Sequence, residues 1–485
     1  MSVLSVYFLI FLLLSTSIFY LVPNKVKPYW ILVCNVYFYL QYGIKHFVFL
    51  FFSVVTVFIG AIIIDKTTEK KMKKVVLGLV LGVNIGVLFL VKFAPCIWGI
   101  TQRLVMFDDS GIVEKIIVPI GISFYTLQVC GYLIDVYREK YVAEKDFMKF
   151  VAFSTFFPLI LQGPISRYDQ LAEQIFQKTR RRDIYHNYTY GAQLMLWGFF
   201  KKLVIADRAS LMVNEVFNNS STYSGAIVIV AILLYTLQIY TDFSGCVDIC
   251  RGAAQLYGIN VIENFKQPYF AISIQDFWKR WHIALSSWFR DYLYIPLGGN
   301  RKGTVRKYIN LLVVFLVSGL WHGEGIHFIV WGLLQAIFQI IGATTLSFKE
   351  KVYEKLGINR SSRFAVLLQR IATFGLINVS WLFFRANGTV EAVKMLTSIL
   401  RTSMMQNGLP IVAISYADFG ILILSTLLLF VVSHYKEKGY SIRDVISQTI
   451  LPVRWGIFLL AFVAVVIFGV YGPGYSDSAF IYMNF

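Results

Sequence analysis

The chain contains a series of apolar runs, most of them about as long as a helix must be to cross a bilayer. A membrane-spanning helix takes about 20 mainly apolar residues. Because the bilayer core offers no water to backbone N–H and C=O groups, such runs are expected to be helical. Strong runs lie at residues 3–22, 47–64, 75–95, 118–136, 190–208, 225–241, 364–384, 415–434 and 452–472, and shorter or less regular ones at 29–42, 147–166 and 308–346.

The composition supports this interpretation. Of the 485 residues, 57% are hydrophobic and 17% are aromatic, and the mean hydropathy is +0.64. Ordinary soluble domains are less apolar than this. We therefore predict an all-α polytopic membrane protein with about 11–13 membrane helices, re-entrant segments included.

The formal net charge of +18 is concentrated in short connections between the apolar runs. Because cytoplasmic loops are enriched in Lys and Arg, these connections are expected to face the cytoplasm, and a nucleic-acid partner is not expected. They are residues 25–27, 66–74, 178–182, 300–307, 349–363 and 436–443. Segments 214–225 and 471–485 contain no Lys or Arg and are expected to face outward. This pattern places both termini on the extracytoplasmic side of a cell (inner, cytoplasmic) membrane.

The apolar segment 308–346 begins after one basic connection and ends before another. It is therefore expected to enter the membrane and return on the same side, with "LWHGEG" near the turn. Irregular backbone at that depth is tolerated where protein or a watery cavity surrounds it, so we expect His322 to line a cavity. His322 and His327 are about 140° apart on a helix, and the five cysteines have no metal-type spacing, so no metal site is predicted.

The segment 263–303 mixes aromatic and basic residues. From Ile274 onward the apolar side chains follow helical spacing, which predicts one amphipathic helix lying at the membrane interface. These apolar side chains are Phe277, Trp281, Ala284, Leu285 and Trp288, and the opposite face carries Lys279, Arg280, Arg290 and Asp291. His282 lies beside the apolar face.

Several kinds of site lack support in the sequence. There is no G-x-S-x-G elbow and no phosphate-binding glycine loop, so neither a covalent serine enzyme nor a nucleotide-driven pump is indicated. Ionisable residues inside a membrane serve catalysis or proton and ion passage. An enzyme and a proton-coupled transporter therefore both remain open. We expect Asp242, Asp248 and Arg385 to hold the fold through buried ion pairs or helix caps.

An ordered set of motifs resembles the membrane-bound O-acyltransferase superfamily, and within it the bacterial branch that serves alginate O-acetylation. The matching segments are "PIGISFYTLQ" (119–128), "QGPISR" (162–167), "GFFKKLVIADR" (198–208), "QIYTDFSG" (238–245), "ENFKQPYF" (263–270), "DFWKRWHIALSSWFRDYLYIPLGGNRKG" (276–303), "GLWHG" (319–323) and "WLFFRA" (381–386).

The resemblance implies that His322 is catalytic and that His282 is a second characteristic histidine nearer the cytoplasmic mouth of a central tunnel. Trp278, Lys279, Arg280, Trp281, Trp321, Asp242 and Ser244 are then candidates for contacting the acyl donor or the tunnel. The expected donor substrate is acetyl-CoA, with no tightly bound cofactor.

The expected partner is an extracytoplasmic esterase-like acyltransferase that modifies a polysaccharide at the cell surface. The expected organisation is a single membrane-embedded domain, 1–485, with N-terminal helices 1–117, a catalytic core 118–386 and C-terminal helices 387–485. A D-alanyl transferase for teichoic acids, which uses a carrier-protein thioester, is the alternative within the superfamily, and a proton-coupled transporter is the alternative outside it.

Overall fold

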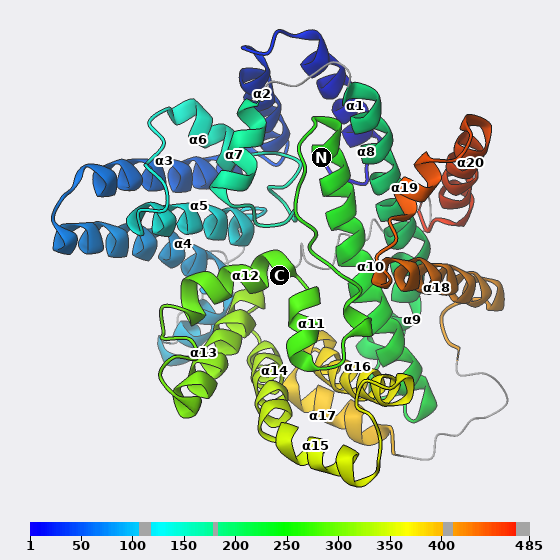
Figure 1. The fold of residues 1–485 in the computed structure, drawn as a ribbon. Coiled ribbons are helices and arrows are strands. Elements are labelled where there is room, and N and C mark those ends of the chain that lie inside the picture. Colours follow the sequence, from blue (N-terminus) through cyan, green and yellow to red (C-terminus); the bar gives the residue numbers. More distant parts are fainter. Residues whose placement is uncertain (106–117, 178–182, 401–410, 472–485) are drawn as a thin grey trace. The chain divides into compact units, whose positions relative to one another are not determined.

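The computed structural model describes residues 1–105, 118–177, 183–400 and 411–471 (Figure 1), and within these ranges the regular structure is entirely helical. Eight of the described helices are long and apolar enough to cross a membrane, and the shorter α1 (Val6–Leu21) is also apolar. The eight are α3 (Ile44–Lys66), α4 (Lys70–Val105), α10 (Ala226–Leu256), α13 (Thr304–His322), α14 (Ile326–Thr344), α16 (Arg363–Arg385), α18 (Tyr416–Glu437) and α20 (Leu451–Phe468). The predicted all-helical membrane protein is therefore confirmed.

The chain divides into two compact units that interleave along the sequence. The first unit comprises residues 1–195 and 247–262, and the second comprises residues 196–246 and 263–485. Two helices pass from one unit to the other, namely α8 (Ile184–Phe199) and α10. The expected division at residues 117 and 386 does not coincide with these boundaries and stays a prediction.

In the first unit, α3 and α4 lie side by side with α5 (Ile122–Tyr137), as Figure 1 shows. Buried polar groups join α3 to α4: the Ser53 hydroxyl donates to Asn84 Oδ1 at 2.5 Å, and Asn84 Nδ2 donates to the Thr56 hydroxyl at 3.1 Å. Such polar pairs hold membrane helices together where apolar contact alone gives little preference. This unit also contains α1, α2 (Lys27–Leu40), α6 (Phe147–Ser154) and α7 (Tyr168–Phe176).

In the second unit, α13 and α14 form an antiparallel hairpin, as the position of segment 308–346 between two basic connections predicts. Each helix has 19 residues, which corresponds to about 28 Å. The two helices approach closely at glycines: a Cβ on Gly319 would lie 2.5 Å from the Phe328 carbonyl oxygen, and one on Gly332 would collide with that of Phe315. Small residues at such contacts are typical of tightly packed membrane helices.

The second unit also contains α16, α18 and α20 and the shorter helices α9 (Asp207–Asn218), α11 (Ile274–Arg280), α12 (Ile283–Phe289), α15 (Leu346–Lys355), α17 (Thr389–Ser398) and α19 (Ile442–Ser447). Segment 274–289 is not the single helix that its periodicity predicts, because α11 and α12 are separated at His282, whose φ is 45°. The predicted apolar face is nevertheless buried throughout. Sequence periodicity thus identified the packed side chains but not the break in the backbone.

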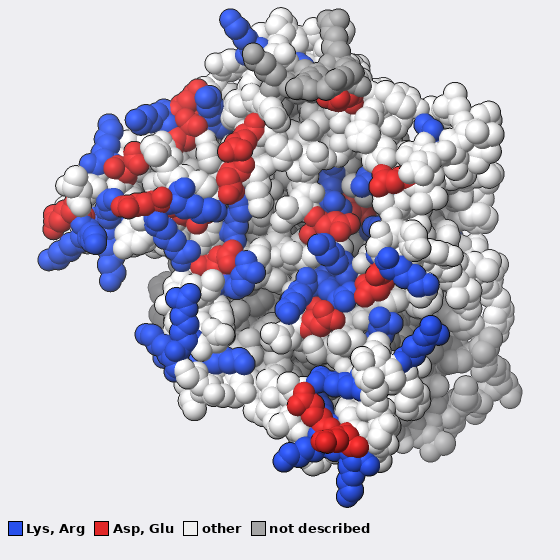
Figure 2. Space-filling view, in the orientation of Figure 1, with Lys and Arg blue, Asp and Glu red and all other residues white. Residues whose placement is uncertain are grey.

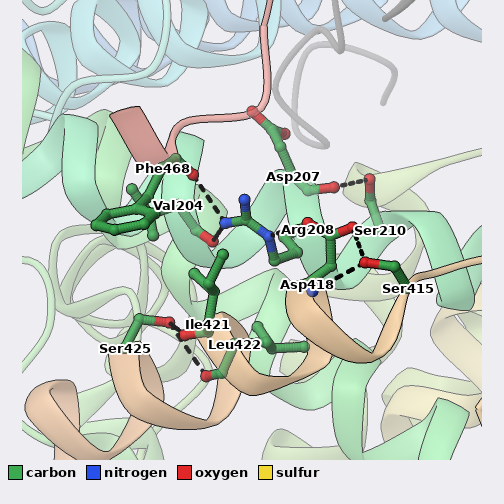
Figure 3. A network of polar contacts seen from close by, with 10 residues as sticks. All are labelled: Val204, Asp207, Arg208, Ser210, Ser415, Asp418, Ile421, Leu422, Ser425 and Phe468. Atoms are coloured by element: carbon green, nitrogen blue, oxygen red, sulfur yellow. Dashed lines mark hydrogen bonds and ion pairs between the residues drawn. The ribbon is translucent and has the colours of Figure 1, made fainter. Parts of the chain in front are cut away.

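Arg208 ties three helices of the second unit together (Figure 3). Its guanidinium donates to Asp418 of α18 at 3.1 Å, and to the carbonyl oxygens of Val204 and Phe468 at 2.9 and 2.8 Å. Phe468 is the last residue of α20. The side chain of Arg208 is only 6% exposed, so its charge is satisfied inside the protein rather than by water.

Two of the three charged residues that were expected to form buried ion pairs or helix caps do form ion pairs. Asp242 forms an ion pair with Lys202 at 2.6 Å, and Asp248 forms one with Arg251 at 3.3 Å, which confirms the predicted ion pairs. Arg385 differs, because it donates to the amide oxygens of Asn214 at 3.0 Å and Asn218 at 3.3 Å. It therefore joins α16 to α9 through asparagine side chains instead of a carboxylate.

The two ends of α16 carry segments with opposite expected orientations. The Ser220 hydroxyl donates to Glu391 at 2.6 Å, and with the Arg385 contacts this places segment 214–225 at the C-terminal end of α16. The basic connection 349–363 leads into its N-terminal end. The helix has 23 residues, or about 34 Å, which is enough to separate two membrane faces.

Figure 2 shows basic side chains gathered over α11, α13 and α15, while the outer edge of α18 and α20 is mostly uncharged. Which side each face meets stays a prediction. The basic segment 178–182 and almost all of the tail 471–485 lie outside the described residues.

Candidate active site

His322 is the last residue of α13 and lies at the turn of the hairpin. Gly323 follows it because a Cβ there would collide with the ring of Phe328. The histidine is 3% exposed and is surrounded by aromatic rings, with centroid distances of 4.9 Å to Trp321, 5.0 Å to Trp331 and 5.1 Å to Phe384. These rings fix the imidazole plane and exclude bulk water from it.

His282 occupies the break between α11 and α12 with φ 45° and ψ 52°. A side chain rarely adopts this left-handed conformation unless its surroundings hold it there. Asn264 supplies that support: its Oδ1 accepts from the Ala284 N–H at 2.9 Å, its carbonyl accepts from the Ile283 N–H at 3.0 Å, and its Nδ2 lies 3.3 Å from His282 Nδ1. Asn264 Oδ1 also lies 3.4 Å from His282 Nδ1, so the direction of this side-chain hydrogen bond depends on the tautomer of the imidazole.

Burial also determines the charge of His282. Its side chain is 1% exposed, and this desolvation lowers its pKa to about 3. His282 is therefore neutral at physiological pH. The ring of Trp321 lies next to both histidines, with its centroid 6.3 Å from His282 and 4.9 Å from His322.

A cavity near these residues lies in the second unit and has a volume of about 980 Å³. This is within the range of small-molecule and cofactor sites. Helices α11 to α16 contribute to its wall. Its lining contains five cations, Lys279, Arg290, Lys307, Lys349 and Arg360, and none of its described lining residues is Asp or Glu.

The cavity ends short of His322. On α13 the innermost lining residue is Ser318, four residues or about 6 Å before the histidine. On α16 the lining stops at Leu376, whereas His322 contacts Phe384, about 12 Å further along the helix. His322 is thus not among the residues that line this cavity, contrary to the expectation that it would line one. Packed aromatic rings lie between the two.

The structure separates the other predicted site residues into three groups. Trp278 and Lys279 line the cavity. Trp281 and Trp321 belong to the aromatic cluster behind it, where Trp281 is 1% exposed and stacks on Phe277 at 5.4 Å.

Arg280, Asp242 and Ser244 lie elsewhere. Arg280 points away from the cavity and pairs with Asp276 at 3.0 Å and Glu437 at 2.7 Å. Asp242 and Ser244 face Lys202 and Lys201, at 2.6 and 2.9 Å respectively. Arg280 and Lys279 differ in surroundings because consecutive helical residues point about 100° apart.

Several residues of the site were missed from the sequence. Asn264 holds His282, Gln335 binds Trp278, and Lys201 and Lys202 hold the "DFSG" segment of α10. The sequence could have indicated the role of the two lysines. They interrupt the apolar run 190–208, where an unpaired charge is costly, so acidic or polar partners were to be expected. Gly245 of "DFSG" is needed because a Cβ there would lie 2.9 Å from the Gly198 carbonyl oxygen.

The described residues hold no group of three or more His, Cys, Asp or Glu side chains arranged to bind a metal ion. His327 lies at the start of α14 with its ring 4.2 Å from that of Phe328. Cys34, Cys130, Cys246 and Cys250 are buried, and Cys96 is exposed.

The fold and site together define a polytopic membrane protein with two buried histidines and a basic cavity beside them. Residues 138–384 match the model of the membrane-bound O-acyltransferase family, and the chain belongs to this family. The family resemblance seen in the motifs is thereby confirmed.

Three relatives illustrate the similarity. The chain is 39% identical over 295 residues to the probable alginate O-acetylase AlgI of Pseudomonas fluorescens, covering 60% of this chain and 57% of that protein. It is 33% identical over 397 residues to the probable alginate O-acetylase AlgI of Pseudomonas putida, covering 81% and 78%. It is 31% identical over 395 residues to the peptidoglycan O-acetyltransferase of Helicobacter pylori, covering 76% and 73%.

Proposed function

We propose that this protein moves an acetyl group from a cytoplasmic thioester donor, acetyl-CoA, across the membrane for O-acetylation of a polysaccharide at the cell surface. The observation that carries the proposal is the basic cavity, which is lined in part by α13, the helix of His322, and ends about 6 Å along that helix from this histidine. Its lining has five cations and no described acidic residue, which suits a donor with several phosphates. Relatives named as an alginate O-acetylase and a peptidoglycan O-acetyltransferase support a polysaccharide as the final acceptor.

In this proposal His322 acts as general base. It takes the proton from an acceptor hydroxyl as the oxygen attacks the thioester carbonyl, so a C–O bond forms and the C–S bond breaks. The proton then passes from His322 to the departing thiolate. The hydroxyl belongs to an extracytoplasmic acyltransferase partner that passes the acetyl group to the polymer. His282, held neutral by burial, orients the ring of Trp321 next to His322.

The five cations that line the cavity are expected to contribute unequally to binding of the acyl donor. Arg290 and Arg360 already pair with Asp291 at 2.8 Å and Glu350 at 3.0 Å. Lys279, Lys307 and Lys349 have no such carboxylate partner among the described residues, so they are the better candidates for donor phosphates.

The test is acetyl-CoA hydrolysis by the purified, detergent-solubilised full chain, with water replacing the missing acceptor. His322→Ala is expected to lower the maximal rate about 100-fold or more, as loss of a general base does. Lys349→Glu is expected to raise the donor concentration for half-maximal rate about fivefold, because an exposed ion pair contributes up to about 1 kcal/mol.

Lys351→Glu is the matched control, because Lys351 lies on the same helix but does not line the cavity. It should have a smaller effect at about 0.15 M salt, where the screening length is about 8 Å. If the wild type neither binds nor hydrolyses acetyl-CoA but accepts a carrier-protein thioester, the D-alanyl alternative replaces the proposal. If neither thioester is consumed and a proton gradient drives solute uptake, the protein is a transporter.

A further inference from the structure

The inner end of the basic cavity is formed by Trp278, Phe315 and Ser318. The rings of Trp278 and Phe315 pack edge to face with centroids 5.2 Å apart. Behind them lies Trp331, which is fully buried, with its ring 5.9 Å from Trp278 and 5.0 Å from His322. A continuous series of ring contacts thus connects Phe315 and Trp278 at the cavity wall through Trp331 to His322.

Trp278 is held in place by a buried hydrogen-bond chain. Its indole N–H donates to Gln335 Oε1 at 3.0 Å, Gln335 Nε2 donates to the Ser380 hydroxyl at 2.7 Å, and Ser380 donates to the Ile377 carbonyl at 2.8 Å. Gln335 and Ser380 are fully buried. Turning the Trp278 ring away would leave the fully buried Gln335 oxygen without this donor, which opposes large displacements.

The backbone around Phe315 is equally constrained. Gly332 of α14 lies against the Phe315 carbonyl oxygen so closely that even a Cβ would collide with it. The hairpin therefore cannot open locally without breaking this contact. With the two helices in this close contact, the side chains of Trp278 and Phe315 limit the room beyond the cavity.

We infer that Trp278 and Phe315 are specificity-determining residues that restrict the transferred acyl group to a short chain. This inference rests on the proposed function, in which the donor arm occupies the cavity and its acyl end lies against these rings. An acetyl group requires a small ring displacement, whereas each further methylene must fit among close-packed aromatic atoms. Close-packed protein interiors resist the insertion of additional atoms.

The experiment compares acetyl-CoA with butyryl-CoA in the hydrolysis assay on the purified full chain. The wild type is expected to prefer acetyl-CoA in kcat/KM by roughly 10- to 200-fold, the usual discrimination for small apolar differences in a packed pocket. Trp278→Leu and Phe315→Ala are each expected to reduce this preference at least tenfold by raising butyryl-CoA turnover. Phe338→Ala is the control, because Phe338 lines the cavity about two turns further from Trp331 and should leave the preference unchanged.

The outcomes separate the two proposals. If the wild type consumes neither thioester, the proposed function fails. If it consumes acetyl-CoA but both variants retain the wild-type preference, or if the wild type accepts both donors equally, the function stands and the assignment of Trp278 and Phe315 is wrong. Because Trp278→Leu also breaks the Gln335 hydrogen bond, Phe315→Ala decides the matter if the first variant does not fold.

Discussion

Replacing Lys202 with Met is expected to be among the most destabilising changes in the second unit. Lys202 Nζ lies 2.6 Å from Asp242 Oδ1 and 2.8 Å from Asp207 Oδ1. The three side chains are 1%, 2% and 7% exposed. Methionine preserves much of the volume but removes the cation, which leaves two buried carboxylates without this counter-charge.

The magnitude follows from burial and the number of partners. Removing one member of a buried ion pair costs about 3–5 kcal/mol. Because Lys202 serves two carboxylates, Lys202→Met should fall near the upper end, about 5 kcal/mol. Asp242→Asn leaves Lys202 paired with Asp207 and should cost about 3 kcal/mol or less. Whole domains are stable by only about 5–15 kcal/mol, so the lysine change removes a large share.

Thermal unfolding of the purified protein in detergent provides the measurement. An unfolding entropy of about 2.1 cal/mol/K per residue gives about 1 kcal/mol/K for 485 residues, so 5 kcal/mol corresponds to a Tm decrease of about 5 °C. The triple variant Lys202→Met/Asp207→Asn/Asp242→Asn should recover most of this loss, because no charge then remains at these three positions. A Tm within 1 °C of wild type for Lys202→Met, or no recovery in the triple variant, would refute the reasoning.

Three further results are expected. A cysteine at exposed Ser221 should react with an impermeant thiol reagent in intact cells, whereas one at exposed Ser361 should react only after the membrane is opened, because they lie at opposite ends of α16. Gly332→Ala should lower the stability of the purified protein by about 1–3 kcal/mol through the clash with the Phe315 carbonyl, while Gly342→Ala, whose Cβ meets nothing, should be neutral or slightly stabilising. Because burial lowers the pKa of His282 to about 3, below the ordinary value of about 6.5, the unfolded state binds a proton that the folded state does not. Stability should therefore fall as the pH decreases from about 6.5 toward 3, by up to about 1.4 kcal/mol per pH unit, and His282→Gln should remove this contribution.

The labelling experiment needs a background in which exposed Cys96 is replaced by serine. The reverse labelling pattern would invert the predicted topology. Equal stability losses for Gly332→Ala and Gly342→Ala would contradict the close helix contact. An unchanged acid slope in His282→Gln would show that other groups control the acid response.

Much of the fold was predictable because membrane helices depend on local composition. Runs such as 47–64 and 364–384 became α3 and α16 since a bilayer demands apolar length and internally satisfied backbone groups. The hairpin containing His322 was predictable for the same reason, combined with basic residues on both sides of segment 308–346. The burial of Phe277 and Trp281 likewise followed from helical spacing.

The remaining features depend on contacts between residues far apart in the chain. The break at His282 requires Asn264, 18 residues earlier, and periodicity within 274–288 contains no trace of it. The Lys202–Asp242 pair and the chain from Trp278 through Gln335 to Ser380 join different helices.

The amino-acid sequence by itself determined which segments are helical and apolar, because those properties arise from neighbouring residues. It also showed that His322 lies within the apolar segment 308–346. Only the tertiary structure decided that the basic cavity ends at Trp278 and Phe315 before reaching His322. That boundary arises from side chains on α11 and α13 packed against α14 and α16, and such packing depends on how helices approach one another, which local sequence does not specify.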